Sequence, residues 1–270
     1  MSKSKKKLLI LPRILLIIIL STACIYLLFI LNIEKDINQV IINEVQPEQT
    51  EDSPLQQPIE EPKRKIETLD QVPYLSQLPE YPNGCEATSA TMVLQYYQHN
   101  IRVYQMMDYI PITPIEQVNN RTYGGNPENT FTGSMIKIGY GIYAPALTKA
   151  INDYLIEVDS PLKATNISGA SKDKIIELLE SGTPIIMWLT DNFQTIHSSS
   201  VHTWYLKENG KYTNQKITFP LNEHCVVLTH YKNGEFTIHD PLQGVIKKDV
   251  DQIMNVYNSF NQMAVILEPK

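Results

Sequence analysis

The sequence predicts an α+β fold for the part of the chain that follows residue 70. Segments with a helical spacing of apolar residues come first, and short apolar runs bounded by turn residues follow them. An Asn-Gly pair between two of those runs predicts a hairpin, and therefore an antiparallel arrangement. Helices followed by antiparallel strands are typical of the α+β class. With 270 residues, 43% of them hydrophobic, the chain can bury one substantial core.

Residues 1–32 predict a basic stub followed by a transmembrane anchor. Lysines and an arginine precede an apolar run that continues without a charge from Ile14 to Leu31, which approaches the length that spans a bilayer. A cleaved signal peptide is the alternative, but its apolar region is shorter. Ser21–Cys24 also hints at a lipoprotein processing site, although strongly apolar residues follow it. We favour an uncleaved single-pass anchor with the N-terminus in the cytoplasm and the domain outside.

Residues 33–70 predict a flexible linker. Glu, Gln, Asp, Pro and Lys dominate this stretch, and it has few aromatic residues, so it cannot bury enough apolar surface to fold. A short stalk helix at Glu34–Asn43 is an equally good interpretation of its first part. The folded domain is therefore expected to span residues 71–270.

Within that domain, the helix with the clearest apolar spacing is expected at 86–99. Further helices are expected at 104–110, 145–155 and 171–181, the last with Ser171 as its N-cap. Val72–Gln77 reads as a short strand or an extended lead-in, and 122–134 as a long surface loop near the site. Strands are expected at 184–190, at 225–231 and 235–240 as a hairpin, and at 262–267.

Cys85 is the first candidate for chemistry. It lies where a turn-rich stretch meets the first helix, and the unpaired N–H groups and partial positive charge of a helix start favour thiolate over thiol. His224 on a later strand fits the role of general base, and Asp240 on the next strand fits the role of the group that orients it. Gln77 and the N–H of Cys85 could bind an oxyanion. Each residue alone has an ordinary structural explanation, and their joint order favours catalysis.

The catalytic interpretation depends on the hairpin register. A two-residue turn at Asn233-Gly234 would place His224 opposite Gln243 and point Asp240 to the other face. A three-residue loop at 232–234 would place position 226 opposite 240, so that His224 and Asp240 share a face. The triad is therefore expected to require the three-residue loop.

Other assignments are weaker. Cys225 follows His224 directly and is expected in the core, although a Cys85–Cys225 disulfide stays an alternative. Histidines 197, 202, 230 and 239 lack a carboxylate at ligand spacing, so no metal and no other cofactor is expected. A net charge of −6 without a basic cluster outside the N-terminus argues against nucleic acid as a partner.

Five segments together resemble the bacterial family-thirty-nine-like cysteine peptidases, which are papain-fold relatives of the bacteriocin-processing, double-glycine leader peptidases. The segments are Val72–Gln77, Asn83–Leu94, Gly182–Trp188, Asn222–Leu228 and His239–Gly244. The resemblance runs from about Val72 to Leu267. It implies a papain-like fold in which a helix carrying the cysteine packs on an antiparallel sheet carrying histidine and aspartate.

The resemblance further implies that Cys85 is the nucleophile, His224 the base, Asp240 the orienting residue and Gln77 the oxyanion donor. In the bacteriocin-processing branch the glutamine lies closer to the cysteine than the eight residues seen here. The expected function is a membrane-anchored, extracytoplasmic cysteine peptidase that hydrolyses peptide or cell-wall amide bonds at the surface of a Gram-positive cell. A catalytically silent papain-fold binding module and an acyl transferase using the same triad are the alternatives. The sequence does not predict the oligomeric state.

Overall fold

A computed structural model describes residues 71–196 and 200–270 of the chain. These residues form a mixed α+β domain around a six-stranded sheet of order β11-β10-β9-β6-β12-β5, in which every neighbouring pair is antiparallel. The strands of this sheet are β5 Leu162–Asn166, β6 Ile185–Thr190, β9 Glu223–Lys232, β10 Glu235–Asp240, β11 Gly244–Asp249 and β12 Ala264–Pro269. The predicted fold class is confirmed.

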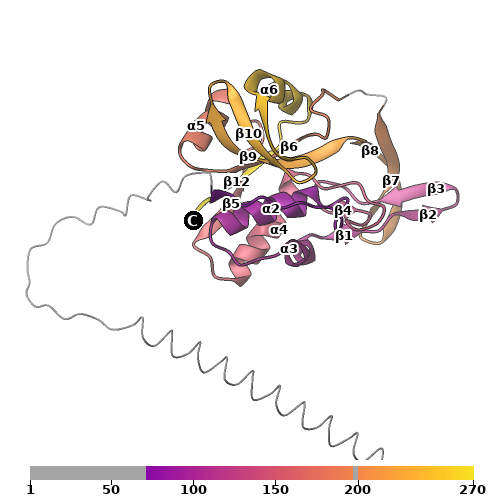
Figure 1. Ribbon diagram of the computed structural model, residues 1–270. Helices are drawn as coiled ribbons and strands as arrows, with labels where there is room; N and C mark the ends of the chain where they lie inside the picture. Colours follow the sequence, from indigo (N-terminus) through magenta and orange to yellow (C-terminus); the bar gives the residue numbers. More distant parts are fainter. Residues whose placement is uncertain (1–70, 197–199) are drawn as a thin grey trace, which may run out of the picture. The chain divides into compact units, whose positions relative to one another are not determined.

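The helices cover the sheet from two sides. They are α2 Cys85–Tyr96, α3 Val103–Tyr109, α4 Ala144–Glu157, α5 Lys172–Glu180 and α6 Val250–Ser259. Helix α2 packs on β9 and β6, and α4 packs on β5 and β12. Helices α5 and α6 lie on the opposite face of the sheet (Figure 1). Apolar side chains of the central strands fill the space between them, and all six residues of β6 are buried.

A second, four-stranded sheet of order β2-β3-β7-β8 lies beside the main one (Figure 1). Its strands are β2 Glu116–Val118, β3 Arg121–Gly124, β7 Val201–Glu208 and β8 Lys211–Pro220. Two short strands, β1 Ile112–Thr113 and β4 Phe131–Thr132, pair in parallel next to it. The segment expected to be a long surface loop at 122–134 therefore contains most of β3 and all of β4.

Helix α2 is the best buried of the helices, since every residue except Gln95 is buried. Small side chains on this helix let its backbone approach the sheet closely. Ser89 shows how close, because its hydroxyl donates to the Cys225 carbonyl of β9 over 3.1 Å. The predicted helix at 86–99 is thus confirmed, although it begins one residue earlier and ends at Tyr96.

The other predicted helices also lie within a few residues of their expected bounds. Ser171 caps α5 as predicted, because its hydroxyl accepts a hydrogen bond from the N–H of Lys174. Val72–Gln77 contains no strand, so the extended lead-in is the correct alternative. Its end is fastened to the sheet where the N–H of Gln77 donates to the carbonyl of Pro241 over 3.0 Å.

The hairpin β9–β10 corrects the predicted loop. Lys232 pairs with Glu235, so the turn has two residues, and Asn233 and Gly234 both adopt positive φ angles of 53° and 81°. The register that places His224 and Asp240 on one face is nevertheless present, and it arises from a different feature. A β-bulge leaves Thr229 without a paired residue on β10. The pairing therefore shifts by one residue, and His239 pairs with Val227. Asp240 consequently lies on the same face as His224.

Several elements were not predicted from the sequence: β1, β2, β5, β7, β8, β11 and α6. In β8 and β11 most residues are exposed or half-buried, so the apolar signal of a strand is weak. Histidine 202, one of the histidines considered and rejected above as metal ligands, lies in β7.

The predicted anchor and linker fall in residues 1–70, outside the described residues. Among the helices that the structure describes, none has the length and apolar character needed to cross a membrane. The boundaries at 32 and 70 stay predictions.

Candidate active site

Cys85 is the first residue of α2 and is 6% exposed. A tight turn delivers it there, since the N–H of Gly84 donates to the carbonyl of Tyr81 over 2.9 Å. A side chain at position 84 would place its Cβ 2.8 Å from the Cβ of Tyr81, so this turn requires glycine. The hydroxyl of Thr88 donates to the Gly84 carbonyl and fixes the first turn of the helix.

His224 and Asp240 form a buried pair. The Nε2 atom of His224 lies 2.7 Å from Oδ1 of Asp240, and both side chains are nearly inaccessible to solvent. The same oxygen accepts from the N–H groups of Leu242 and Gln243. Although burial opposes ionisation, these hydrogen bonds hold the pKa of Asp240 below its ordinary value. An ionised Asp240 keeps the proton on Nε2 and leaves Nδ1 as the ring nitrogen that can accept one.

Gln77 is 1% exposed and lies on the extended lead-in. Its Nε2 atom donates to the Pro82 carbonyl over 2.8 Å, and its Oε1 atom is buried and has no hydrogen-bond partner in the described part of the chain. Since an amide nitrogen carries two hydrogens, one N–H remains for an oxyanion. The contact with Pro82 also closes the loop that leads to Cys85.

A cavity of about 240 Å³ joins these residues. Gln77, Cys85 and His224 line it, and Asp240 stands behind His224. The far wall comes from the second sheet and the loop before α4, through Tyr140, His202, Phe219 and Pro220. The structure thus brings all four predicted site residues to one place. It adds an aromatic wall, in which the rings of Tyr140 and His202 lie 4.2 Å apart between centroids.

Two carboxyl groups beside the thiol were not predicted. The Cys85 sulfur lies 3.3 Å from Oε2 of Glu86, whose Oε1 accepts from the N–H of Ile142 over 2.7 Å. Glu223 approaches the same place, so that a Cβ added to Gly141 would meet oxygens of both acids at 2.8 Å. The signal was present in the sequence, because each acid adjoins a predicted catalytic residue.

The environment of Cys85 also corrects the expected ionisation. Burial first, and then the negative charges of Glu86 and Glu223, raise the pKa of the Cys85 thiol well above its ordinary value. Burial likewise raises the pKa of Glu86 to about 6 and that of Glu223 well above its usual range. These effects oppose the electrostatic effect of the helix start, so the surroundings of Cys85 favour the neutral thiol over the thiolate.

Cys225 is buried and free, as is Cys85, so the structure contains no Cys85–Cys225 disulfide. The ligand atoms of Cys85, Glu86 and Glu223 lie within 4.8 Å of one another. Among the described residues this is the group whose spacing could hold a metal ion. The sequence-based prediction of no metal considered four histidines and did not consider these three residues.

Comparisons with known proteins identify the family of this chain. Residues 69–265 match the model of the Peptidase_C39 like family. The chain is 25% identical over 192 residues to the uncharacterized protein YvpB of Bacillus subtilis strain 168, covering 70% of this chain and 71% of that protein. The crystal structure of a putative C39-like peptidase from Bacillus anthracis superposes with a TM-score of 0.64 at 26% identity, covering 75% of this chain and 97% of the other.

A double glycine motif protease from an AMS/PCAT transporter, solved with its leader peptide, is similar at a TM-score of 0.40 and 20% identity, covering 74% of this chain and 93% of the other. The family match spans most of the chain and all of the strands and helices named above except the last residues of β12. The chain therefore belongs to the Peptidase_C39-like family.

Proposed function

We propose that this protein is a cysteine peptidase in which Cys85, His224, Asp240 and Gln77 carry the reaction. The observation that carries the proposal is the buried hydrogen bond between His224 and Asp240, in a cavity that also exposes the thiol of Cys85 and the amide of Gln77. A histidine held in one tautomer that lines the same cavity as a thiol at a helix start is an arrangement suited to nucleophilic catalysis.

The proposed reaction begins with a proton transfer. Because the resting Cys85 is a neutral thiol, His224 must take its proton as the sulfur attacks the substrate carbonyl. The oxyanion that forms would accept hydrogen bonds from the N–H of Cys85 and from Nε2 of Gln77. His224 then protonates the leaving amine, which leaves an acyl group on Cys85. Water, deprotonated by His224, releases the acid and restores the thiol.

Substrate class and location are part of the same proposal. We infer a peptide or a cell-wall stem peptide as the substrate, and a domain held outside the membrane by the predicted anchor in residues 1–32. Two carboxyl groups, Asp191 and Glu223, line the cavity, and no lysine or arginine of the described residues does so. This lining favours substrates that bring a positively charged or neutral group to the site.

A second candidate is supported by one observation: the side-chain hydrogen bond of the Cys85 thiol is with Glu86, and none to His224 is found among the described residues. A silent binding module that keeps the fold would also hold its thiol neutral. Acyl transfer to an amine, with the same triad, would be revealed by amide products when an amine is added to a working assay.

The test is to incubate the full-length protein with a peptide library and with purified cell-wall muropeptides, and to find new termini by mass spectrometry. We expect cleavage by the wild type and a loss of about 10³-fold or more in Cys85→Ala. Cys225→Ala is the matched control and should keep its activity. Iodoacetamide should label Cys85 faster than Cys225. Equal, slow labelling with no cleavage of either substrate would favour the binding module.

A further inference from the structure

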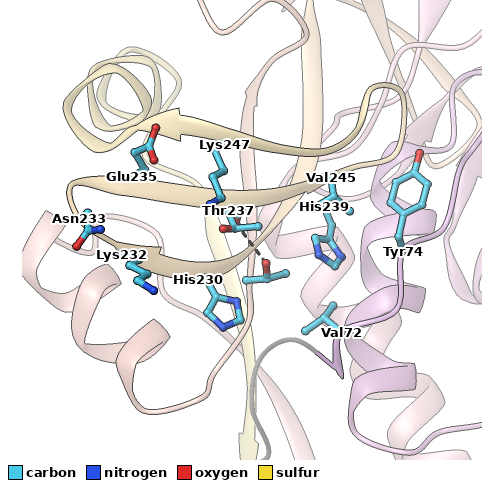
Figure 2. A pocket seen from close by; sticks show the side chains of 11 residues that line it. Val72, Tyr74, His230, Lys232, Asn233, Glu235, Thr237, His239, Val245 and Lys247 are labelled. Carbon is cyan, nitrogen blue, oxygen red and sulfur yellow. Dashed lines mark hydrogen bonds between the residues drawn. The ribbon is translucent and has the colours of Figure 1, made fainter.

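A second and larger cavity, of about 750 Å³, lies on the outer three strands of the main sheet (Figure 2). Strand alternation separates it from the candidate active site. In β10, Asp240 points to the face that carries His224, whereas Glu235, Thr237 and His239 line the second cavity.

His239 is a buried group without a full set of partners. It is 8% exposed, and its Nδ1 atom is buried with no hydrogen-bond partner among the described residues. In the neutral ring with the proton on Nε2, Nδ1 is a hydrogen-bond acceptor. An unpaired buried acceptor is costly, so a ligand that donates a hydrogen bond would stabilise it.

Positive charge faces the same space. Lys232 and Lys247 both line the cavity, and within the described residues no carboxylate forms an ion pair with either of them. Glu235 is the single acidic residue of the lining. Two ammonium groups on neighbouring parts of one wall favour an anion as the ligand.

The remaining lining supplies hydroxyl groups and a partly apolar rim. Thr237 stands between the strands that carry the two lysines, and its carbonyl accepts from the hydroxyl of Thr229 (Figure 2). Tyr74 is 39% exposed and meets His239 edge-on, with 6.4 Å between the ring centroids. Val245 is 54% exposed. An aromatic ring next to polar groups suits the carbon face of a polyol or sugar.

We propose that this cavity binds a small anion that also carries hydroxyl groups, such as an acidic sugar or a polyol phosphate. The anionic group would lie between Lys232 and Lys247, a hydroxyl would donate to Nδ1 of His239, and the carbon skeleton would rest against Tyr74. The site contains none of the four proposed catalytic residues, so its occupancy does not depend on the proposed peptidase reaction.

Calorimetric titration of the full-length protein tests this proposal. Glycerol 3-phosphate and glucuronate serve as the phosphate and carboxylate probes, glycerol and glucose as uncharged counterparts, and sulfate as an oxyanion without a hydroxyl. We expect at least one charged probe to bind about tenfold more tightly than its uncharged counterpart and than sulfate. The tighter of the two charged probes identifies the kind of acidic group.

Variants place the binding in this cavity. Lys247→Gln and Lys232→Gln should each weaken the charged probe by about tenfold. Lys248→Gln is the matched control, because Lys248 is the next residue of β11 and points to the other face, over the ring of Phe193 at 4.8 Å. It should leave the affinity unchanged, as should Cys85→Ala.

Any of three outcomes would contradict the proposal that this cavity binds a hydroxylated anion. Neither charged probe binds at millimolar concentration, or sulfate binds as tightly as the hydroxylated anions, or the two lysine variants bind as the wild type does. Loss of peptidase activity in Cys85→Ala with unchanged binding of the anion would leave this proposal intact, and a failure of the peptidase proposal would not affect it.

Discussion

His239 and Asp240 are consecutive residues of β10, and the two cavities beside them differ in both charge and size. Around Asp240 the polar groups are nearly inaccessible and the neighbouring charges are acidic, with Glu86 and Glu223 crowding a neutral thiol. Around His239 the lining residues are mostly exposed and the uncompensated charges are basic. One strand can support two such sites because its alternate side chains never share an environment.

The difference teaches what each site is suited to. A small, acid-lined space with buried titratable groups raises the pKa values of those groups and so controls when protons move, which suits chemistry. A wide space whose lysines form no ion pair among the described residues attracts an anion from solvent, which suits binding. Variants that change residues on one face of β10 and leave the other face intact test whether the two cavities have these separate roles.

The largest effect is expected from Asp240→Ala. It removes the acceptor that three hydrogen-bond donors share, so His224 loses its orientation, and peptide cleavage should fall by about 10²- to 10⁴-fold. Removing one partner of this buried pair should also lower the free energy of unfolding by about 3 kcal/mol. Both effects are measured by steady-state kinetics on a cleaved peptide and by urea unfolding.

Two further variants serve as comparisons for Asp240→Ala. Asp240→Asn keeps an acceptor for His224 and should recover part of the rate and most of the stability. Asp251→Ala removes a surface acid, 82% exposed and paired with Lys172, and should change neither. Wild-type cleavage by Asp240→Ala would exclude Asp240 from the proposed triad.

The sequence predicted the contents of the first site better than its construction. Order along the chain was enough to select Cys85, His224, Asp240 and Gln77, and the structure places them together. The register that brings His224 and Asp240 to one face arises differently from the prediction. The hairpin has a two-residue turn, and a bulge at Thr229 shifts the pairing of β9 and β10 by one residue. Polar and β-branched residues fit a bulge or a regular ladder equally well, so periodicity could not reveal it.

The ionisation of Cys85 was predicted incorrectly for a related reason. A helix start is visible in sequence, but burial and the approach of Glu223 from β9 depend on tertiary packing. The second cavity could not be predicted either. Its lining comes from β9, β10, β11 and the lead-in, and strand β11 alternates between half-buried and exposed residues without an apolar signal.

An intermediate effect is expected from Glu86→Gln. The folded-state pKa of Glu86 is raised from 4.5 to about 6, so its contribution to stability is complete below pH 4.5 and is lost as the pH rises through 6. The loss amounts to about 2 kcal/mol. The variant should therefore gain stability relative to the wild type between pH 4.5 and 7.5, as measured by urea unfolding at several pH values.

Glu180→Gln, on the exposed side of α5, is the matched control and should follow the wild type across this range. The isosteric glutamine can still accept from the N–H of Ile142, so the loop before α4 should stay in place. Parallel stability curves for Glu86→Gln and the wild type would mean that Glu86 is not strained by its charge, and the contrast between the two cavities would then rest on geometry alone.

The smallest effect is expected from Glu235→Gln in the second cavity. Glu235 is exposed, so solvent and salt screen its repulsion of a bound anion, and its removal should tighten binding of the charged probe by only about twofold to threefold. The sign is the informative part, because any loss of affinity would mean that Glu235 accepts a hydroxyl of the ligand and belongs to the site. The gain should shrink as salt is added, whereas a hydrogen bond from the ligand to His239, which is buried, should be almost insensitive to salt. Titrations at low and high ionic strength therefore separate the electrostatic part of the proposed recognition from the part that depends on the buried imidazole.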